Sequence, residues 1–170
     1  MTIHFKITAA LLDRVRVDLG RPHEFALERV GFITTRPGRL HDGGLILLAT
    51  DYLPVAEDDY LDKPGFGALM GAVAIRKALE HTYNNRVGMF HVHEHRGRGR
   101  PGFSRTDERE MCKFVPDFFN ANADVPHGAL VLSADSMRAY CWLSRTEGPF
   151  QITRHTVVGS PMRLIGDHCE

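Results

Sequence analysis

The feature that most constrains the fold is the order in which strand-like and helix-like segments alternate along the chain. Strand-like segments are short runs of alternating or continuous apolar residues, whereas helix-like segments repeat their apolar residues every three or four positions. Strand-like character is found at residues 4–8, 29–35, 45–55, 87–93, 128–133, 137–143 and 150–158. Helical character is found at residues 9–19, 67–84 and 104–120. Helices inserted between strands in this order predict a mixed sheet with helices packed around it, an α+β (mixed α/β) fold.

Turn residues and apolar runs add detail to this order. Residues 36–38, Arg-Pro-Gly, predict a turn after the second strand, and residues 42–44, Asp-Gly-Gly, predict a turn before the third. The continuous apolar run at residues 45–49 predicts a buried strand, and the acidic residues 57–59 predict an exposed loop. The small residues of the 67–84 helix predict close packing on the sheet.

Chain length and composition are those of one compact domain. The chain has 170 residues, 43% of them hydrophobic, which is sufficient for a single core. We find no internal repeat and no long linker. We therefore expect one domain over residues 1–170 with one functional site.

Charge and cysteine content bear on partners and compartment. Lys plus Arg and Asp plus Glu number 21 each, so we expect no nucleic-acid partner and no anionic membrane surface. No apolar run reaches the roughly 18 residues that span a bilayer, and the N-terminus lacks a signal-peptide pattern. Cys112, Cys141 and Cys169 are odd in number and far apart, which favours a reducing, cytoplasmic compartment, and their lack of CxxC spacing argues against a structural zinc knuckle. We expect Cys112 and Cys141 in the core and Cys169 on the surface.

The densest histidine cluster begins with His91 and His93. Two histidines at alternate positions of a strand project to the same side and can bind one metal ion. Asp107, one turn into the helix that begins near Ser104, is the candidate third ligand. Two histidines and one carboxylate leave a fourth position for water, as in catalytic zinc sites. A further carboxylate is needed to accept the proton of that water and to deliver it to a leaving amine.

Each of these features, taken singly, has an ordinary structural interpretation. A bare His-x-His is more often solvated or hydrogen-bonded in a core than bound to metal. Residues 104–107, Ser-Arg-Thr-Asp, are also typical of a helix N-terminus. Glu28 alone would be a surface carboxylate before a strand. Only the combination predicts zinc chemistry.

The chain combines Glu28 before an apolar strand, His91-Val92-His93, and Ser104-Arg105-Thr106-Asp107, in that order. This set resembles the JAMM (JAB/MPN+) family of zinc metalloproteases, and the resemblance extends over about residues 4–143. It implies an MPN/JAB-like fold, related to that of cytidine deaminases. It also implies that His91, His93 and Asp107 hold zinc. Glu28 would then act as general base and acid, and Ser104 would stabilise the tetrahedral oxyanion.

Two features leave alternatives open. Residues 94–103, between His93 and Ser104, form a longer loop than is usual in the family, and the loop is rich in arginine. This loop is either part of a substrate groove or a mobile, solvated segment, and His95 within it is a competing metal ligand. Glu24 is a rival to Glu28 as catalytic carboxylate, but the strand follows Glu28 directly and favours it.

Other classes of protein fit the sequence less well. A cupin also contains His-x-His, but Gly88 is too close to His91, and Gly97 and Arg98 occupy the positions where a cupin has glutamate. A nucleic-acid enzyme would depend on a few arginines in residues 94–103. A metal-free MPN-type binding scaffold would typically lack the ligand set that this sequence keeps.

The resemblance also implies a substrate class. JAMM members cleave isopeptide or peptide bonds after the C-terminal glycine of ubiquitin-like proteins, and some prokaryotic members process sulfur-carrier proteins. The single domain resembles the stand-alone prokaryotic members, which often work beside activating and conjugating enzymes. We therefore expect a deconjugase or precursor-processing protease for a ubiquitin-like protein. We expect the Gly-Gly tail of that protein to add along a strand edge.

Overall fold

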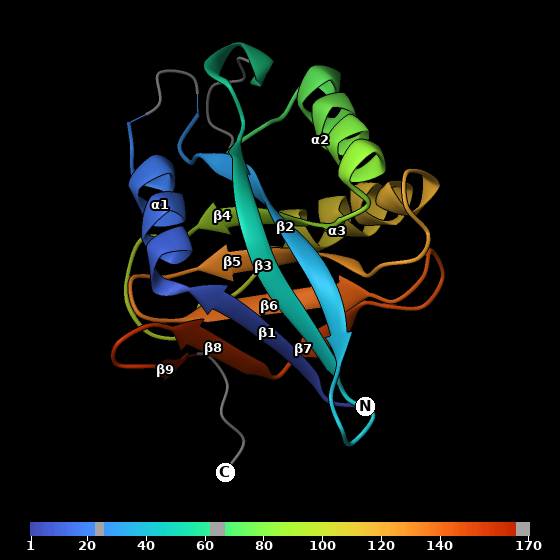
Figure 1. Ribbon diagram of the computed structural model, residues 1–170. Helices are drawn as coiled ribbons and strands as arrows, with labels where there is room; N and C mark the ends of the chain where they lie inside the picture. The colour runs from blue at the N-terminus through green and yellow to red at the C-terminus, as the bar shows by residue number, and fades with distance from the viewer. Residues whose placement is uncertain (23–25, 62–66, 166–170) are drawn as a thin grey trace.

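The strands and helices build one mixed sheet with helices packed around it (Figure 1). The computed structural model describes residues 1–22, 26–61 and 67–165. The strands are β1 (Ile3–Thr8), β2 (Val30–Arg39), β3 (Leu45–Pro54), β4 (Gly88–Glu94), β5 (His127–Leu132), β6 (Met137–Trp142), β7 (Phe150–Ile152), β8 (Arg154–Val158) and β9 (Arg163–Ile165). The α-helices are α1 (Ala9–Leu19), α2 (Ala72–Asn85) and α3 (Arg105–Phe114), and the 3₁₀ helices are η1 (Glu57–Asp59) and η2 (Val115–Asn120).

The sheet is curled, and its margins approach each other. In the order β7-β6-β5-β4-β2-β3-β1-β8-β9, strands β7 and β8 lie near opposite ends. Along the chain, however, only Thr153 separates them, and β7 also contacts β1. One residue cannot cross an open sheet whose neighbouring strands are about 4.8 Å apart. The sheet therefore bends around an apolar interior until β7 lies close to β1 and β8.

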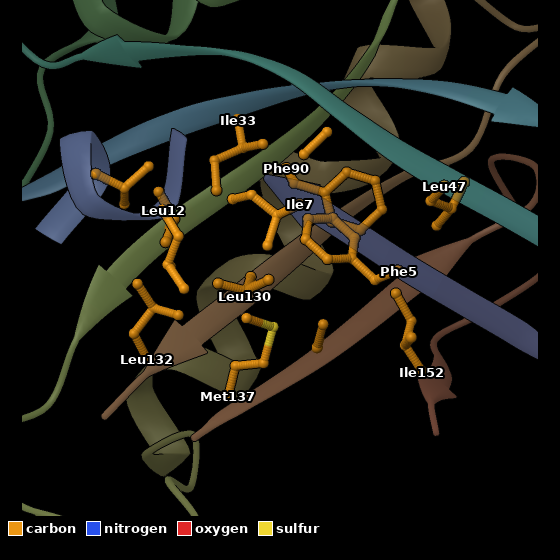
Figure 2. Packing of buried hydrophobic residues seen from close by; sticks show 14 of the residues in the cluster. Phe5, Ile7, Leu12, Ile33, Leu47, Phe90, Leu130, Leu132, Met137 and Ile152 are labelled. Carbon is orange, nitrogen blue, oxygen red and sulfur yellow. The ribbon is translucent and has the colours of Figure 1, made fainter. Parts of the chain in front are cut away.

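The largest core fills this interior (Figure 2). Helix α1 begins at Thr8, whose side-chain oxygen accepts a hydrogen bond from the backbone N–H of Leu11 at 3.2 Å. The helix then buries Leu12, Val15 and Leu19 at helical spacing. The other interior side chains come from β1 to β8 and include Phe5, Ile7, Ile33, Leu47, Phe90, Leu130, Leu132, Met137 and Ile152.

The opposite face of the sheet is covered by α2 and η2. Phe32 and Met89 on this face belong to one buried cluster with Ala74 and Ala78 of α2 and Phe118 of η2. A further cluster joins α3 and η2 to β5 and β6. The sheet is therefore apolar on both faces, with helices on each.

Strand β4 separates the two faces at the centre of the sheet. It lies between β2 and β5, and alternate side chains of a strand point in opposite directions. Phe90 and Val92 lie in the interior core, whereas Met89 lies in the cluster under α2. His91 and His93 therefore share the outer face with Met89.

Several predictions from the sequence are confirmed. The α+β class is observed, as are the N-terminal strand and the helix at residues 9–19. The predicted hairpin across residues 134–136 is formed by the antiparallel pair β5 and β6. Strand β1 pairs in parallel with β3 and β8, and β4 pairs in parallel with β5, so the sheet is mixed as expected.

The predicted turn at residues 36–38 is wrong, because β2 continues through this segment and remains paired with β3. Beyond Thr35, β2 has no pairing with β4, so one of its edges is free there. Pro37 lacks an N–H but is tolerated in such a position, because only one side of the strand carries a ladder. The predicted turn at residues 42–44 does lie between β2 and β3.

Two predictions about exposure also need correction. The apolar run at the start of β3 alternates in burial, since Leu47 is fully buried and Leu48 is 44% exposed. A continuous apolar run therefore forms a strand with one covered face. The acidic segment η1 is not wholly exposed, because Asp59 is buried and accepts a hydrogen bond from Lys77 Nζ at 2.6 Å.

The helix predicted over residues 67–84 begins only at Ala72. Leu69 and Met70 are extended instead, and they pair with the chain at Tyr60 and its neighbour Leu61. The prediction of close packing through small residues is confirmed, because the buried positions of α2 are Ala74, Ala78 and Thr82.

The last two predicted segments are divided. The helix over residues 104–120 ends at Phe114, and the 3₁₀ helix η2 follows with Pro116 in its first turn. Proline has no N–H for an α-helical hydrogen bond, which accounts for the change. The single strand predicted at residues 150–158 is two strands at different margins of the sheet, and β9 was not predicted.

Cys141 is buried as predicted, whereas Cys112 is exposed, because it lies on the outer side of α3. Cys169 lies outside the described residues. Within the described ranges, no helix has both the length and the apolar character needed to cross a bilayer.

Candidate metal centre

Glu28 lies just before β2 on a segment anchored to Gly67. The backbone N–H groups of Leu27 and Glu28 both donate to the carbonyl oxygen of Gly67, at 2.8 and 3.2 Å. A methyl group on Gly67 would lie 3.3 Å from Glu28 Oε2, so the glycine lets the carboxylate lie close to the backbone. The rival Glu24 lies outside the described residues.

His91 and His93 lie on the face of β4 that is covered by aromatic side chains. The His91 ring is 5.8 Å from the Phe32 ring and 5.3 Å from the Phe114 ring, between centroids. The His93 ring is 5.9 Å from the Phe103 ring. The two imidazole centroids are 5.6 Å apart. Phe32, Phe103 and Phe114 thus exclude water from one side of the histidine pair.

Asp107 is brought to the histidines by the N-terminus of α3. Ser104 is the N-cap, and its Oγ accepts a hydrogen bond from Asp107 N at 3.1 Å. In return, Asp107 Oδ2 accepts a hydrogen bond from Ser104 N at 2.7 Å, which completes a capping box. The same Oδ2 atom is 3.6 Å from His93 Nε2. The capping box therefore holds the carboxylate beside the imidazole.

His95 lies between the two carboxylates. Its Nε2 atom is 3.9 Å from Asp107 Oδ2 and 4.0 Å from Glu28 Oε1. Donor atoms of Glu28, His93 and His95 all lie within 4.8 Å of one another. Glu28, His93 and His95 therefore gather around one point, and Asp107 adjoins the two histidines.

Three ring nitrogens of the histidine pair are buried without a hydrogen-bond partner among the described residues. His93 is 2% exposed, and neither of its ring nitrogens has a hydrogen-bond partner among the described residues. His91 Nε2 is likewise buried without a partner within those ranges. Buried polar nitrogens are almost always hydrogen-bonded or bound to metal, because leaving them unpaired costs free energy. The donor set of imidazoles and carboxylates fits zinc in this respect.

Burial and the neighbouring charges set the protonation states of the centre. Burial, helped by the adjacent His93 and opposed by Asp107, lowers the pKa of His91 to about 3. His91 is therefore neutral at physiological pH, which is the form that binds metal. Burial alone would raise the pKa of Asp107, but His93 and Ser104 together bring it below its usual range. Asp107 is therefore an anion, as a zinc ligand requires.

The arginine-rich loop at residues 94–103 is held against the β5–β6 turn. Gly99 N donates to Asp135 Oδ1 at 2.7 Å, and Ser133 Oγ donates to the carbonyl of Gly99 at 2.6 Å. Ala134 N donates to the carbonyl of Gly97 at 3.0 Å. These bonds do not fit a wholly solvated loop, and they favour the alternative of a structured loop beside the centre.

An open pocket of about 780 Å³ lies beside Glu28. Glu28 and His95 line it together with Arg21, Arg96 and Gly97, so the start of the loop forms one wall. The pocket is open to solvent and mixed in polarity. The carboxylate of Glu28 is therefore accessible from this side.

Of the residues that the sequence singled out, Glu28 and His93 lie with His95 in one group of donor atoms, whereas His91 and Asp107 lie beside His93 but outside that group. His93, Asp107 and Glu28 gather around His95, and His91 adjoins His93. Sequence reasoning named His95 only as a competitor and did not anticipate that it contacts both carboxylates. The signal was present, because residues 91, 93 and 95 alternate along one strand direction.

No family model and no curated protein matches the chain. Among solved structures, the chain is similar to the STIL N-terminal domain of Trichoplax adhaerens, with a TM-score of 0.39 and 10% sequence identity. The similarity covers 82% of this chain and 41% of that one, so the chain spans less than half of that structure's length. A similarity this low defines neither the fold family nor the function of the chain.

Proposed function

We propose that this chain is a zinc-dependent peptidase that cleaves isopeptide or peptide bonds after the C-terminal glycine of a ubiquitin-like protein. One observation carries the proposal: beside the anionic Asp107, buried imidazole nitrogens of His91 and His93 have no hydrogen-bond partner in the described part of the chain. Glu28 lies at the open side of the same cluster. Hydrolytic zinc sites need this division between buried ligands and an accessible carboxylate.

The fold also supports the resemblance to the JAMM family. The order of strands and helices agrees with the prediction up to β6, and the three motifs lie on the elements that the prediction gave them. Glu28 precedes β2, the histidines lie on β4, and the Ser-x-x-Asp motif opens α3. An MPN/JAB-like fold and a cytoplasmic location belong to this proposal.

His91, His93 and Asp107 would hold the zinc ion. Bound zinc would lower the pKa of a water molecule and polarise the scissile carbonyl. Glu28 would accept a proton from that water and deliver it to the leaving amine, and its side chain is 34% exposed and within reach of solvent. The aromatic rings around His91 and His93 would keep bulk water from the ligands.

Ser104 would stabilise the oxyanion of the tetrahedral intermediate. Its Oγ already accepts a hydrogen bond from Asp107 N, so its hydroxyl proton is free to be donated elsewhere. Its place at the N-terminus of α3 adds the positive end of the helix dipole. The capping role and the catalytic role are therefore compatible.

The open pocket beside Glu28 is the approach proposed for the substrate tail. A Gly-Gly tail carries no side chains that would obstruct an approach between the 94–103 loop and the segment before β2. If so, cleavage requires these glycines. Undiminished turnover of a modifier whose terminal glycines are replaced by leucine would rule out this part of the proposal.

Metal analysis tests the ligands. We expect the purified chain to contain zinc, and the double variant His91→Ala with Asp107→Ala to lose it, as measured by elemental analysis. His41→Ala, at an exposed turn residue, is the matched control and retains the zinc of the parent. Full retention of zinc in the double variant would contradict the ligand assignment. A parent chain that binds no zinc would instead favour a metal-free scaffold.

A second experiment tests Glu28. Glu28→Ala should retain zinc and lose cleavage of a ubiquitin-like fusion or isopeptide conjugate by roughly 10²- to 10⁴-fold, the usual contribution of a general acid or base. Loss of zinc together with activity would show that Glu28 is a ligand. Unchanged cleavage would contradict its catalytic role.

A further inference from the structure

His95 has no task in the proposed reaction, yet it lies at the middle of the centre. Its Nε2 atom is 3.9 Å from Asp107 Oδ2 and 4.0 Å from Glu28 Oε1. Its ring centroid is 4.8 Å from that of His93. Its side chain is 30% exposed, so it lies between the buried ligands and the open pocket.

The position of His95 is fixed by the backbone. His95 N donates to the carbonyl of Leu132 at 2.9 Å, which continues the pairing of β4 with β5 by one residue. Its side chain therefore keeps the direction of His93 and does not follow the glycine-rich loop. The following residues are held in turn by the bonds of Gly97 and Gly99 to the β5–β6 turn.

The separations between donor atoms are close to those of a metal site. Tetrahedral zinc with ligands at about 2.0–2.1 Å requires donor atoms about 3.3 Å apart. The distances from His95 to the carboxylates exceed this by less than 1 Å. Small side-chain movements of the partly exposed Glu28 and His95 would close the difference. His93 supplies a third donor, because its buried ring nitrogens have no hydrogen-bond partner within the described ranges.

We propose that His95 is a metal ligand, and that Glu28, His93 and His95 form a second ligand set that shares His93 with the proposed first set. The ion would be a divalent cation that prefers imidazole and carboxylate, such as Zn²⁺ or Co²⁺. The inference rests on the proposed function, since both sets belong to the same centre. Because His93 is common to both, the two sets compete for one ion.

The second set has a functional consequence. An ion held by Glu28 occupies the carboxylate that must accept the proton from water, so that position is unproductive. The first set leaves Glu28 free. His95 therefore determines what fraction of the bound metal lies in the unproductive position.

Metal titration of four proteins tests the inference. They are the parent chain, Asp107→Ala, His95→Ala and the double variant Asp107→Ala with His95→Ala. Each apo-protein is titrated with Zn²⁺ against a chelating dye, and with Co²⁺ while the visible absorption of the bound ion is recorded. We expect Asp107→Ala to bind one ion per chain through the second set when metal is added, but more weakly than the parent, so that purification can still remove the ion. We expect the double variant to bind at least about tenfold more weakly than Asp107→Ala, since even outer-shell partners contribute 10- to 100-fold. His41→Ala should titrate as the parent does.

The Co²⁺ spectrum gives a readout that does not depend on activity. We expect the spectrum of Asp107→Ala to change when His95 is also removed, because an imidazole leaves the ion. Equal affinity and equal spectra for Asp107→Ala and the double variant would overturn the inference and leave the proposed function intact. If His91→Ala with Asp107→Ala binds metal as tightly as the parent, and the further change His95→Ala removes that binding, the inference stands and the first ligand set is wrong.

Folding of the variants is controlled separately. Asp107→Ala removes half of the capping box of α3, so circular dichroism must show native helix content. Asp107→Asn serves as a second background, because its amide oxygen can still accept from Ser104 N while the ligand charge is lost. We expect Asp107→Asn with His95→Ala to bind metal at least about tenfold more weakly than Asp107→Asn alone. Equal affinity of these two variants would overturn the inference.

Discussion

Single residues set the geometry of the centre, and the closest constraint on Glu28 is the absence of a side chain at Gly67. The carbonyl of Gly67 accepts hydrogen bonds from two successive N–H groups, those of Leu27 and Glu28. The carboxylate of Glu28 lies back against the same glycine. Sequence patterns gave no indication of this contact, because Gly67 lies far from Glu28 along the chain and has no motif of its own.

Gly67→Ala should therefore impair catalysis without removing metal. The added methyl group would lie 3.3 Å from Glu28 Oε2 and would push the carboxylate aside. Because misplacement of a catalytic group by 1 Å can cost about 100-fold, we expect turnover to fall about tenfold. Zinc content should not change. Steady-state cleavage measures the turnover, and elemental analysis measures the zinc content. Gly38→Ala, where no atom lies within 4 Å of the new methyl group, is the matched control and should be as active as the parent.

His127 is buried under η2 and is held as a neutral ring. Its Nδ1 accepts a hydrogen bond from Met89 N at 3.0 Å, and its Nε2 donates to the carbonyl of Asn122 at 2.8 Å. Phe118 and Phe119 pack against the ring. Burial lowers the pKa of His127 from 6.5 to about 4, against a smaller opposing effect of the Asn122 carbonyl. Protonation would break the bond to Met89.

This histidine predicts a loss of stability in mild acid. Between pH 6.5 and about 4 the unfolded chain binds a proton at His127 and the folded chain does not, so the free energy of unfolding falls as pH falls. Between pH 7.5 and pH 5, His127 lowers the free energy of unfolding by about 2 kcal/mol. Urea unfolding at the two pH values measures it. His127→Asn should be less stable at pH 7.5 and lose about 2 kcal/mol less on acidification. If the free energy of unfolding of His127→Asn depended on pH as strongly as that of the parent, the acid sensitivity would not come from His127. His41→Asn is the control and should show the pH dependence of the parent.

At the scale of elements, α2 shows how small side chains fix the distance between a helix and the sheet. Its buried positions are Ala74, Ala78 and Thr82, and Ala78 is 2% exposed. Close approach of α2 covers Phe32 and Met89, which flank the histidines on β2 and β4. The composition of the helix predicted this packing correctly.

Ala78→Leu tests how closely α2 lies against the sheet. The larger side chain has no room against the sheet, and overpacking of this kind typically costs 1–3 kcal/mol. We expect a decrease of about 2 kcal/mol in the free energy of unfolding, measured by urea denaturation. Ala72→Leu, at an exposed position of the same helix, should change stability by less than about 0.5 kcal/mol. Similar effects of the two substitutions would show that α2 is not closely packed.

The elements also show what local sequence can predict. Helix α1 and the β5–β6 hairpin were predicted correctly because their apolar spacing, caps and turns are local signals. The histidines of β4 were predicted to share a face for the same reason. The continuation of β2 through residues 36–38 was missed, because proline is tolerated only where one edge is free, and that depends on the partner strand.

At the scale of the whole molecule, closure of the sheet was not predictable from the segments. The apolar run at residues 150–158 reads as one strand, but tertiary pairing divides it at Thr153 between β6 and β1. The gathering of Glu28, His95 and Asp107 was likewise invisible in local patterns. It arises because β2 and β4 are neighbours in the sheet and because α3 begins beside them. The order of the motifs indicated Glu28 and Asp107. The distances between these side chains and His95 depend on the closed sheet.

Closure predicts that β7, although short and at a margin, is part of the cooperative core. Ile152 on β7 is fully buried in the interior core with Phe5 and Leu47, whereas Phe150 on the same strand is 40% exposed. Ile152→Ala should lower the free energy of unfolding by about 2–5 kcal/mol through the cavity it creates. Phe150→Ala should cost much less because less of its surface is buried.

Cooperativity distinguishes closure from a frayed edge. If β7 closes the interior, Ile152→Ala lowers the midpoint of one urea transition, recorded equally by circular dichroism and by the fluorescence of Trp142 on the adjacent β6. Amide exchange in β7 would then approach the protection of the central strands, since opening β7 would expose the interior. A frayed edge would instead exchange quickly while the rest of the sheet stayed protected, and Ile152→Ala would cost no more than Phe150→Ala. That outcome would mean that the interior is closed by the remaining strands and α1 alone.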